Sequence, residues 1–192
     1  TWILRAASPC PDFPPQPGVP LALATITTAS VILHWIANGN PSSTTYQVTR
    51  EREPSPGQKV SSDTVAVVGI SKLMDKLTPN TSYSFSVEAE NGDRFRTDPV
   101  SLGSMYTDAQ APDRVHWTAI TMSGVTLSWD PLNNPRTTVY EVRGSTASSM
   151  WPLMNPTPQL FSEGKTANTF SMNGLLTSTT YYFDVAARNL AT

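Results

Sequence analysis

An internal repeat is the feature that most constrains how this chain folds. Three blocks recur in the same order: Val31–Trp35 as Val125–Trp129, Tyr46–Val48 as Tyr140–Val142, and Leu77–Asn91 as Leu175–Asn189. The first two pairs of blocks lie 94 positions apart and the third pair lies 98 apart, so the second copy contains a short insertion. Because order, spacing and residue type all match, the 192 residues hold two copies of one structural unit.

Within each copy, apolar and polar residues alternate with the period of two that is typical of β-strands. In the clearest run, Tyr83, Phe85 and Val87 alternate with short polar or acidic residues. Clusters of Asn, Gly and Pro interrupt these runs, as at Asn38–Pro41 and Asn133–Pro135. No segment shows a convincing helical period. The sequence therefore predicts an all-β fold of two tandem antiparallel β-sandwiches.

The residues shared by the two copies resemble those of fibronectin type III repeats. Each copy has a tryptophan on its second strand and a leucine six residues before a tyrosine that opens a strand ending in Ala-x-Asn. The resemblance covers the chain from Gly18 onward. It implies that Trp35 and Trp129 lie in the two cores and that Tyr83 and Tyr181 form tyrosine corners, with the hydroxyl bonded to nearby backbone. It implies a scaffold for adhesion, spacing or recognition, which leaves the function open.

The alignment of the copies predicts three regions: an N-terminal strand with a Pro-rich linker at 1–17, a first domain at 18–108 and a second domain at 109–192. The first domain is expected to end with a strand at about 100–107. Thr192 aligns with position 94, so the second sandwich is expected to lack its last strand within the chain. The absent segment corresponds to 95–111, which matches the 17-residue length of the N-terminal region.

The N-terminal region has the pattern of a strand that could fill this place. Trp2, Leu4 and Ala6 would lie on one face, with Ile3 and Arg5 on the other. Prolines follow and favour a stiff, extended spacer. We therefore expect the strand of one subunit to complete the second sandwich of another copy, which is donor-strand complementation. Because such a contact is heterologous, it predicts a head-to-tail extracellular filament with copies of the chain as partners.

A second interpretation remains open at this point. The chain begins with Thr1 rather than Met, so it is a processed product or a piece of something longer. It would then be an adhesion or spacer module excised from a larger tandem-repeat protein of the cell surface or the secreted fraction. Abundant Ser and Thr, few lysines and 17 prolines favour an extracellular or cell-surface location under either interpretation.

Composition and motifs argue against several other functions. A net charge of −2 with 15% charged residues does not favour nucleic-acid or anionic-membrane binding. No apolar run approaches the roughly 20 residues that span a bilayer. No metal-ligand spacing, phosphate-binding loop or nucleophile motif is present, so we predict no enzyme, cofactor or metal site. Asp98, Asp108 and Asp113 flank the expected linker and leave calcium binding as a weaker alternative.

Three further features are candidates for contacts or modification. Asn80-Thr81-Ser82 is an N-glycosylation acceptor triplet, which also occurs often by chance; glycans would then be additional partners. The insertion of the second copy carries a candidate contact patch of Met150, Trp151, Leu153 and Met154, or else a loop that folds back on its own sandwich. The single cysteine, Cys10, is an unpaired linker residue or forms an intermolecular bridge.

Overall fold

A computed structural model describes residues 14–18, 25–53, 61–146 and 159–190 of the chain. These residues form twelve β-strands and contain no helix that is long and apolar enough to cross a membrane. They divide into two compact units. Unit 1 comprises the described residues before Thr27, together with Ser30–Asp75 and Ser82–Met105, and unit 2 comprises Thr27–Ala29, Lys76–Thr81 and the residues from Tyr106 onward.

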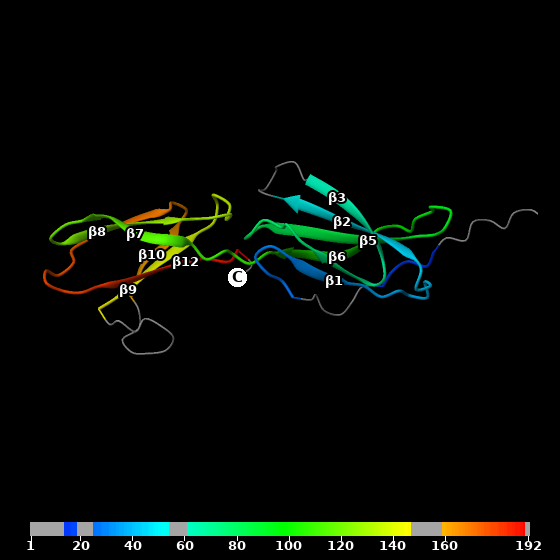
Figure 1. Ribbon diagram of the computed structural model, residues 1–192, viewed down its shortest axis with the longest axis horizontal. Helices are drawn as coiled ribbons and strands as arrows, with labels where there is room; N and C mark the ends of the chain where they lie inside the picture. Colours follow the sequence, from blue (N-terminus) through cyan, green and yellow to red (C-terminus); the bar gives the residue numbers. More distant parts are fainter. Residues whose placement is uncertain (1–13, 19–24, 54–60, 147–158, 191–192) are drawn as a thin grey trace, which may run out of the picture. The chain divides into compact units, whose positions relative to one another are not determined.

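Unit 1 contains two antiparallel arrangements of strands (Figure 1). β1 (Val31–His34) pairs with β4 (Ser71–Met74). The larger sheet has the order β3-β2-β5-β6, formed by β3 (Ser61–Val68), β2 (Thr45–Glu53), β5 (Ser82–Glu90) and β6 (Val100–Tyr106). Burial alternates at every residue of β5, as the period of two requires. The core holds Trp35 against Tyr46, with 5.4 Å between ring centroids.

Unit 2 repeats this construction with two three-stranded sheets. One has the order β11-β8-β7, formed by β11 (Thr169–Asn173), β8 (Gly124–Asp130) and β7 (Asp113–Ile120). The other has the order β10-β9-β12, formed by β10 (Gln159–Lys165), β9 (Tyr140–Ser145) and β12 (Tyr182–Ala187). Its core includes Trp129 against Tyr140, with 5.5 Å between ring centroids. The aromatic pair of unit 1 is therefore reproduced.

The four-stranded sheet of unit 1 has one strand more than its counterpart in unit 2. β2, β3 and β5 of unit 1 correspond to β9, β10 and β12 of unit 2, whereas β6 has no counterpart among the described residues of unit 2. The predicted all-β fold of two tandem sandwiches is confirmed. β6 lies at Val100–Tyr106, where the last strand of the first copy was expected.

Candidate functional site

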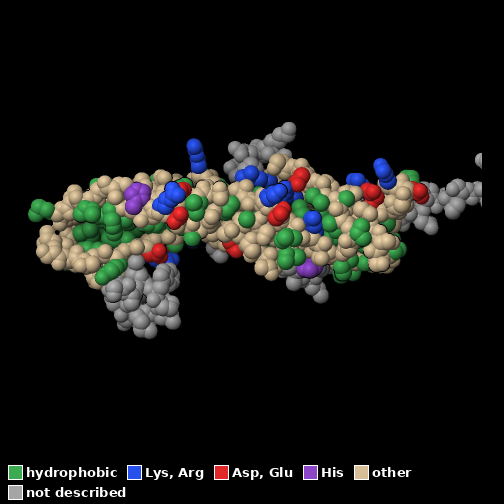
Figure 2. Space-filling model, viewed as in Figure 1, with side chains coloured by type: hydrophobic (Ala, Val, Ile, Leu, Met, Phe, Trp, Pro, Cys, Tyr) green, Lys and Arg blue, Asp and Glu red, His purple; other side chains and the backbone are tan. Residues whose placement is uncertain are grey.

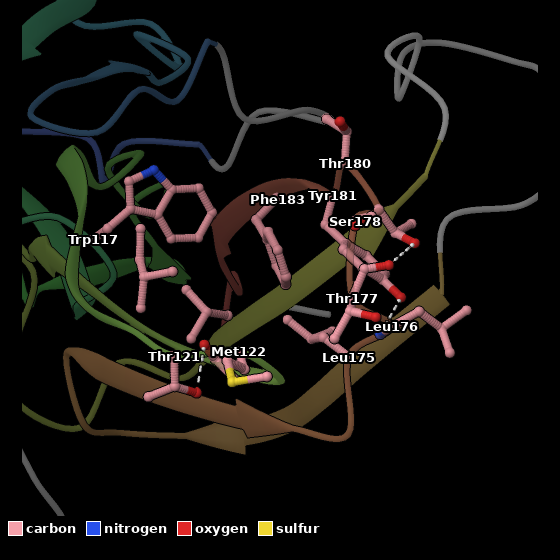
Figure 3. A pocket seen from close by; sticks show the side chains of 14 residues that line it. Trp117, Thr121, Met122, Leu175, Leu176, Thr177, Ser178, Thr180, Tyr181 and Phe183 are labelled. Carbon is pink, nitrogen blue, oxygen red and sulfur yellow. Dashed lines mark hydrogen bonds between the residues drawn. The ribbon is translucent and has the colours of Figure 1, made fainter.

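A groove of about 490 Å³ lies in unit 2 between β7 of one sheet and β12 of the other, lined by apolar side chains and by the hydroxyl side chains of 177–180. Trp117 of β7 contacts Phe183 of β12 edge to face, with 5.4 Å between ring centroids and 80° between ring planes (Figure 3). On the rim, Ile120, Met122 and Leu176 are 73%, 86% and 71% exposed. Figure 2 shows hydrophobic side chains gathered in a hollow over the part of unit 2 that Figure 1 labels β7 and β8. Contiguous apolar exposure of this kind marks a binding surface more often than it marks ordinary surface.

Comparison with the equivalent residues of unit 1 shows that the groove lacks a covering strand. Tyr83 and Phe85 of β5 are buried, whereas Tyr181 and Phe183, their equivalents in unit 2, are only partly buried. In unit 1, β6 lies beside β5 and contributes Leu102 to the core. The groove of unit 2 therefore lies where a strand equivalent to β6 would cover the aromatic residues of β12.

β7, on the other side of the groove, is also more exposed than a strand of a sandwich normally is. All eight of its residues are exposed, although a strand at the wall of a sandwich normally buries every second residue. Its pairing with β8 also shifts register twice, between Asp113 and His116 and between Trp117 and Ala119. The strand is thus held to its own sheet along one edge while its apolar side chains remain uncovered.

The turn at 174–178 forms one end of the groove and has a well-defined conformation. The hydroxyl of Tyr181 accepts a hydrogen bond of 3.1 Å from the backbone N–H of Leu176, which is the tyrosine-corner contact. Gly174 and Ser178, the first and last residues of the turn, have φ values of 80° and 54°. These left-handed residues direct the tip of the turn, which is exposed, away from the sheet.

A second turn of unit 2, at 76–80, buries Leu77, Pro79 and Asn80, although Lys76 is exposed. Asn80 is 1% exposed, and its Nδ2 donates hydrogen bonds to Thr138 Oγ1 at 3.0 Å and to the carbonyl of Arg188 at 3.2 Å. The backbone N–H of Leu190 donates to Asn80 Oδ1 at 2.9 Å. We call Thr138, Arg188 and Leu190 the socket. Because Nδ2 is also the atom that would carry an N-linked glycan, glycosylation of Asn80 and occupancy of the socket exclude one another.

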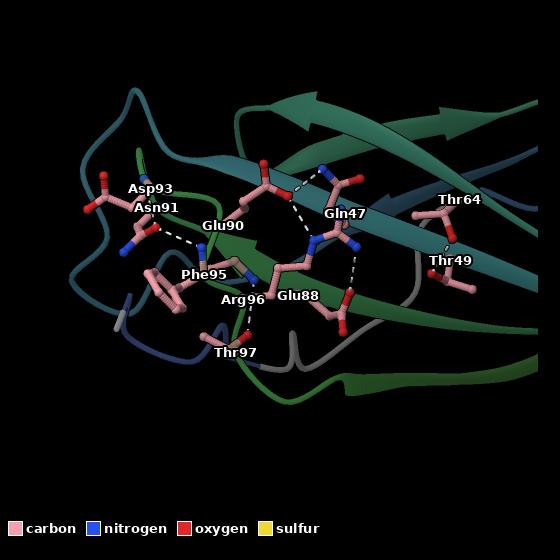
Figure 4. Close-up of polar contacts among 11 residues, drawn as sticks. Gln47, Thr49, Thr64, Glu88, Glu90, Asn91, Asp93, Phe95, Arg96 and Thr97 are labelled. Carbon is pink, nitrogen blue, oxygen red and sulfur yellow. Dashed lines mark hydrogen bonds and ion pairs between the residues drawn. The ribbon is translucent and has the colours of Figure 1, made fainter. Parts of the chain in front are cut away.

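The loop at 91–97 of unit 1 is held by a network of polar contacts (Figure 4). The side-chain oxygen of Asn91 accepts the backbone N–H groups of Asp93 at 3.0 Å and Phe95 at 2.9 Å. Arg96 Nε donates to Glu90 Oε2 at 2.8 Å, and this hydrogen bond holds the pKa of Glu90 below its ordinary value of 4.5. The loop therefore presents the exposed Phe95 from a fixed conformation.

The positions predicted from sequence are distributed unevenly over the structure. Trp35, Trp129 and Tyr83 are buried and Tyr181 is partly buried. The N-terminal strand, Cys10 and the patch of Met150, Trp151, Leu153 and Met154 lie outside the described residues. The sequence predicted that the second sandwich lacks its last strand, but it did not identify the walls of the groove, Trp117 and Met122 among them. The feature of the sequence that could have identified them is the apolar segment Val115–Ile120, which directly precedes the turn at 121–124.

Comparison with known proteins agrees with this construction. The family model described as Fibronectin type III domain matches residues 14–101 and 110–192. A segment of two fibronectin type III domains from chicken tenascin is similar in structure, with a TM-score of 0.65 and 21% identity over 90% of this chain and 91% of that chain. A crystal structure of the FN1–FN3 domains of chicken CNTN1 has a TM-score of 0.35 and 18% identity, covering 91% of this chain and 64% of that chain. The family matches span most of the sequence, and the chain belongs to the fibronectin type III family, of which it carries two tandem domains.

Proposed function

We propose that the chain is a structural subunit of an extracellular filament, assembled head to tail by donor-strand complementation. In this arrangement, residues 1–8 of one copy lie along β12 of the next copy and cover the groove. The observation that carries the proposal is the partial exposure of Tyr181 and Phe183, whose equivalents Tyr83 and Phe85 are buried in unit 1, where β6 is present.

The sequence of the N-terminal strand favours one alignment of this strand with the positions of β6. β6 buries Leu102, so the donor strand should place a large apolar residue at that position. Counting by the equal 17-residue lengths would put Ser8 there and Pro9 inside the strand, where proline cannot donate a ladder hydrogen bond. Sliding the strand by four residues puts Leu4 at the position of Leu102 and moves Pro9 beyond the paired region. The equal lengths therefore do not set the register.

Filling the groove would supply a substantial driving force. Burial of a large apolar side chain contributes about 1.5–3 kcal/mol, and Trp2 and Leu4 are both of this kind. Backbone hydrogen bonds along β12 add to this, as in other cases of strand addition. Ordering the donor strand opposes part of the gain. The balance favours association whenever the subunit concentration is high.

Deletion of residues 1–8 tests the proposal. We expect the full chain to form filaments in negative-stain micrographs and the deletion variant to elute as a monomer in size-exclusion chromatography. Leu4→Asp should also abolish filaments, because a carboxylate would be buried in an apolar groove. Arg5→Gln is the matched control, since Arg5 lies on the opposite face of the strand and its replacement should leave assembly intact. Filaments that survive the deletion would rule out the donor strand.

A second candidate function is an adhesion or spacer module within a longer tandem-repeat protein, where a strand of the same polypeptide fills the groove. The observation that favours it is the loop at 91–97, which Asn91 and Arg96 hold in one conformation with Phe95 exposed. A fixed loop with an exposed aromatic residue suits recognition of a partner. Monodisperse, folded monomers of the full chain at high concentration would favour this candidate over the filament subunit.

A further inference from the structure

The contact in the occupied socket of unit 2 indicates how two molecules of this chain could bind each other. The turn at 76–80 enters it with the side chain of Asn80, which is bonded to Thr138, to the carbonyl of Arg188 and to the N–H of Leu190. Two of these three partners are backbone groups, so the contact depends more on chain geometry than on side-chain identity. The result is visible in burial, because Thr138 is 0% exposed beneath the turn.

Unit 1 contains the same socket in an open form. The positions equivalent to the socket residues are Thr44, Glu90 and Gly92, and all three line a pocket of about 460 Å³. The local backbone agrees: the N–H of Thr44 donates to the carbonyl of Pro41 at 3.0 Å, and that of Thr138 donates to the carbonyl of Pro135 at 2.9 Å. Thr44 is partly exposed, which is the state expected of Thr138 if its turn were removed.

An asparagine supports the two sockets in the same way. Asn134 Nδ2 donates to the carbonyl of Pro131 at 3.1 Å and to that of Gln110 at 2.7 Å. Asn40 Nδ2, at the equivalent position, donates to the carbonyl of Ala37 at 2.7 Å and to that of Pro15 at 2.6 Å. In both sockets, this asparagine therefore bonds to the segment that leads into the domain.

The turn at 174–178 is the equivalent of the turn that fills the socket. Ser178 has a φ of 54° and Asn80 has a φ of 48°, and the first residue of each turn is also left-handed. Each turn is anchored by a matching bond of 2.9 Å, from Leu175 N–H to the carbonyl of Ser123 and from Leu77 N–H to that of Ala29. Residues 176–180 are all exposed. The described chain thus has one turn in a socket, one exposed turn and one open socket.

We infer that the turn at 174–178 of one copy docks into the open socket of unit 1 of the next copy, with Ser178 in the place that Asn80 takes in unit 2. The inference rests on the proposed filament and adds a second contact to it. The two contacts are compatible, because this turn also lines the groove, while Pro14 and Pro15 line the socket.

Serine makes fewer bonds in this position than asparagine does. Its hydroxyl can donate to Thr44 Oγ1 or to the carbonyl of Glu90, but it cannot donate twice and accept at the same time from separate atoms as the amide of Asn80 does. The docking of Ser178 should therefore be weaker than that of Asn80 and should depend on the donor strand for most of its affinity.

Disulfide trapping in the full chain tests the docking. In a Cys10→Ser background, Thr44→Cys combined with Ser178→Cys should yield a ladder of covalent oligomers under a mild oxidant. Ser71→Cys with Ser178→Cys is the matched control, because Ser71 is exposed on β4 and does not line the pocket. Asn80→Cys with Thr138→Cys is the positive control and should cross-link within one chain. We expect at least tenfold more ladder from the 44–178 pair than from the 71–178 pair.

The outcomes separate this inference from the proposed function. If filaments depend on residues 1–8 but the 44–178 ladder does not exceed the control, the docking is wrong and the donor strand stands. If the ladder forms and filaments survive deletion of residues 1–8, the docking stands and the donor strand is wrong. If neither the ladder nor filaments form, both are overturned.

A gain-of-contact variant gives an independent readout. Ser178→Asn restores the residue found in the occupied turn, and asparagine tolerates the left-handed conformation well. Produced in a bacterial host without N-glycosylation, it should lower the concentration at half assembly by about tenfold, the effect of one or two added hydrogen bonds. Ser178→Ala should raise that concentration. Unchanged assembly in both variants would contradict the docking.

Discussion

At the scale of single residues, Asn80 meets two demands that few side chains satisfy together. Its backbone is left-handed, and only glycine, asparagine and aspartate adopt that conformation readily. Its amide both donates and accepts, so it satisfies a hydroxyl, a carbonyl and an N–H in a site that excludes water. Aspartate would lose the donors and glycine would lose every side-chain contact.

Replacement of Asn80 by alanine should therefore destabilise unit 2. We expect the free energy of unfolding to fall by about 1–3 kcal/mol, because buried partners are left without their hydrogen bonds and alanine disfavours the left-handed backbone. Asn38→Ala is the matched control, since Asn38 has a φ of 52° but an exposed side chain, whose hydrogen bond to the carbonyl of Gln16 lies at the surface. Urea unfolding followed by tryptophan fluorescence measures both losses. Equal losses in the two variants would show that the socket contributes nothing.

The burial of Asn80 also shows where sequence reasoning ends. The triplet Asn80-Thr81-Ser82 has the sequence of an N-glycosylation acceptor, but the triplet does not indicate whether Asn80 is buried. The residues that bury it lie 58 and 108–110 positions away in the chain. No local pattern carries information on contacts between segments so distant.

At the scale of elements, local alternation predicted the strands well and packing poorly. β5 alternates at every position, so its inward residues could be identified from sequence. β6 could not be read in this way, because its buried residues Leu102 and Met105 are three positions apart. Gly103 between them has a φ of 98°, which changes the register of the side chains. The walls of the groove were missed because their exposure depends on which strand is absent.

Leu102 offers a test of what the last strand contributes. Leu102→Ala removes the residue that β6 places in the core of unit 1, so we expect a loss of about 2–4 kcal/mol in the free energy of unfolding. Ser101→Ala, at the exposed neighbouring position, should change stability little. Calorimetry of the full chain should show the change in one transition only. A loss below 1 kcal/mol would indicate that unit 1 does not depend on β6 as we argue.

At the scale of the whole molecule, the differences between the two copies determine which surfaces of two molecules can associate. Each copy has a place for a last strand, a turn and a socket, and within the described residues the two copies fill different ones. A contact that joins the exposed turn and groove of one molecule to the socket and strand of another uses different surfaces on each side. Such heterologous contacts propagate unless they close into a ring.

If a donor strand fills the groove, the stability of unit 2 should depend on protein concentration. A partner that binds only the folded form adds about 2.7 kcal/mol when its free concentration is one hundred times the dissociation constant. For a domain of this size, that corresponds to a rise of roughly 10 °C or more in the unfolding midpoint. Scanning calorimetry over a hundredfold range of concentration should thus move one transition upward. The transition of unit 1, which has β6, should move much less. In the variant lacking residues 1–8, both midpoints should be independent of concentration, and a midpoint of unit 2 that is constant in the full chain would mean that no second copy covers β12.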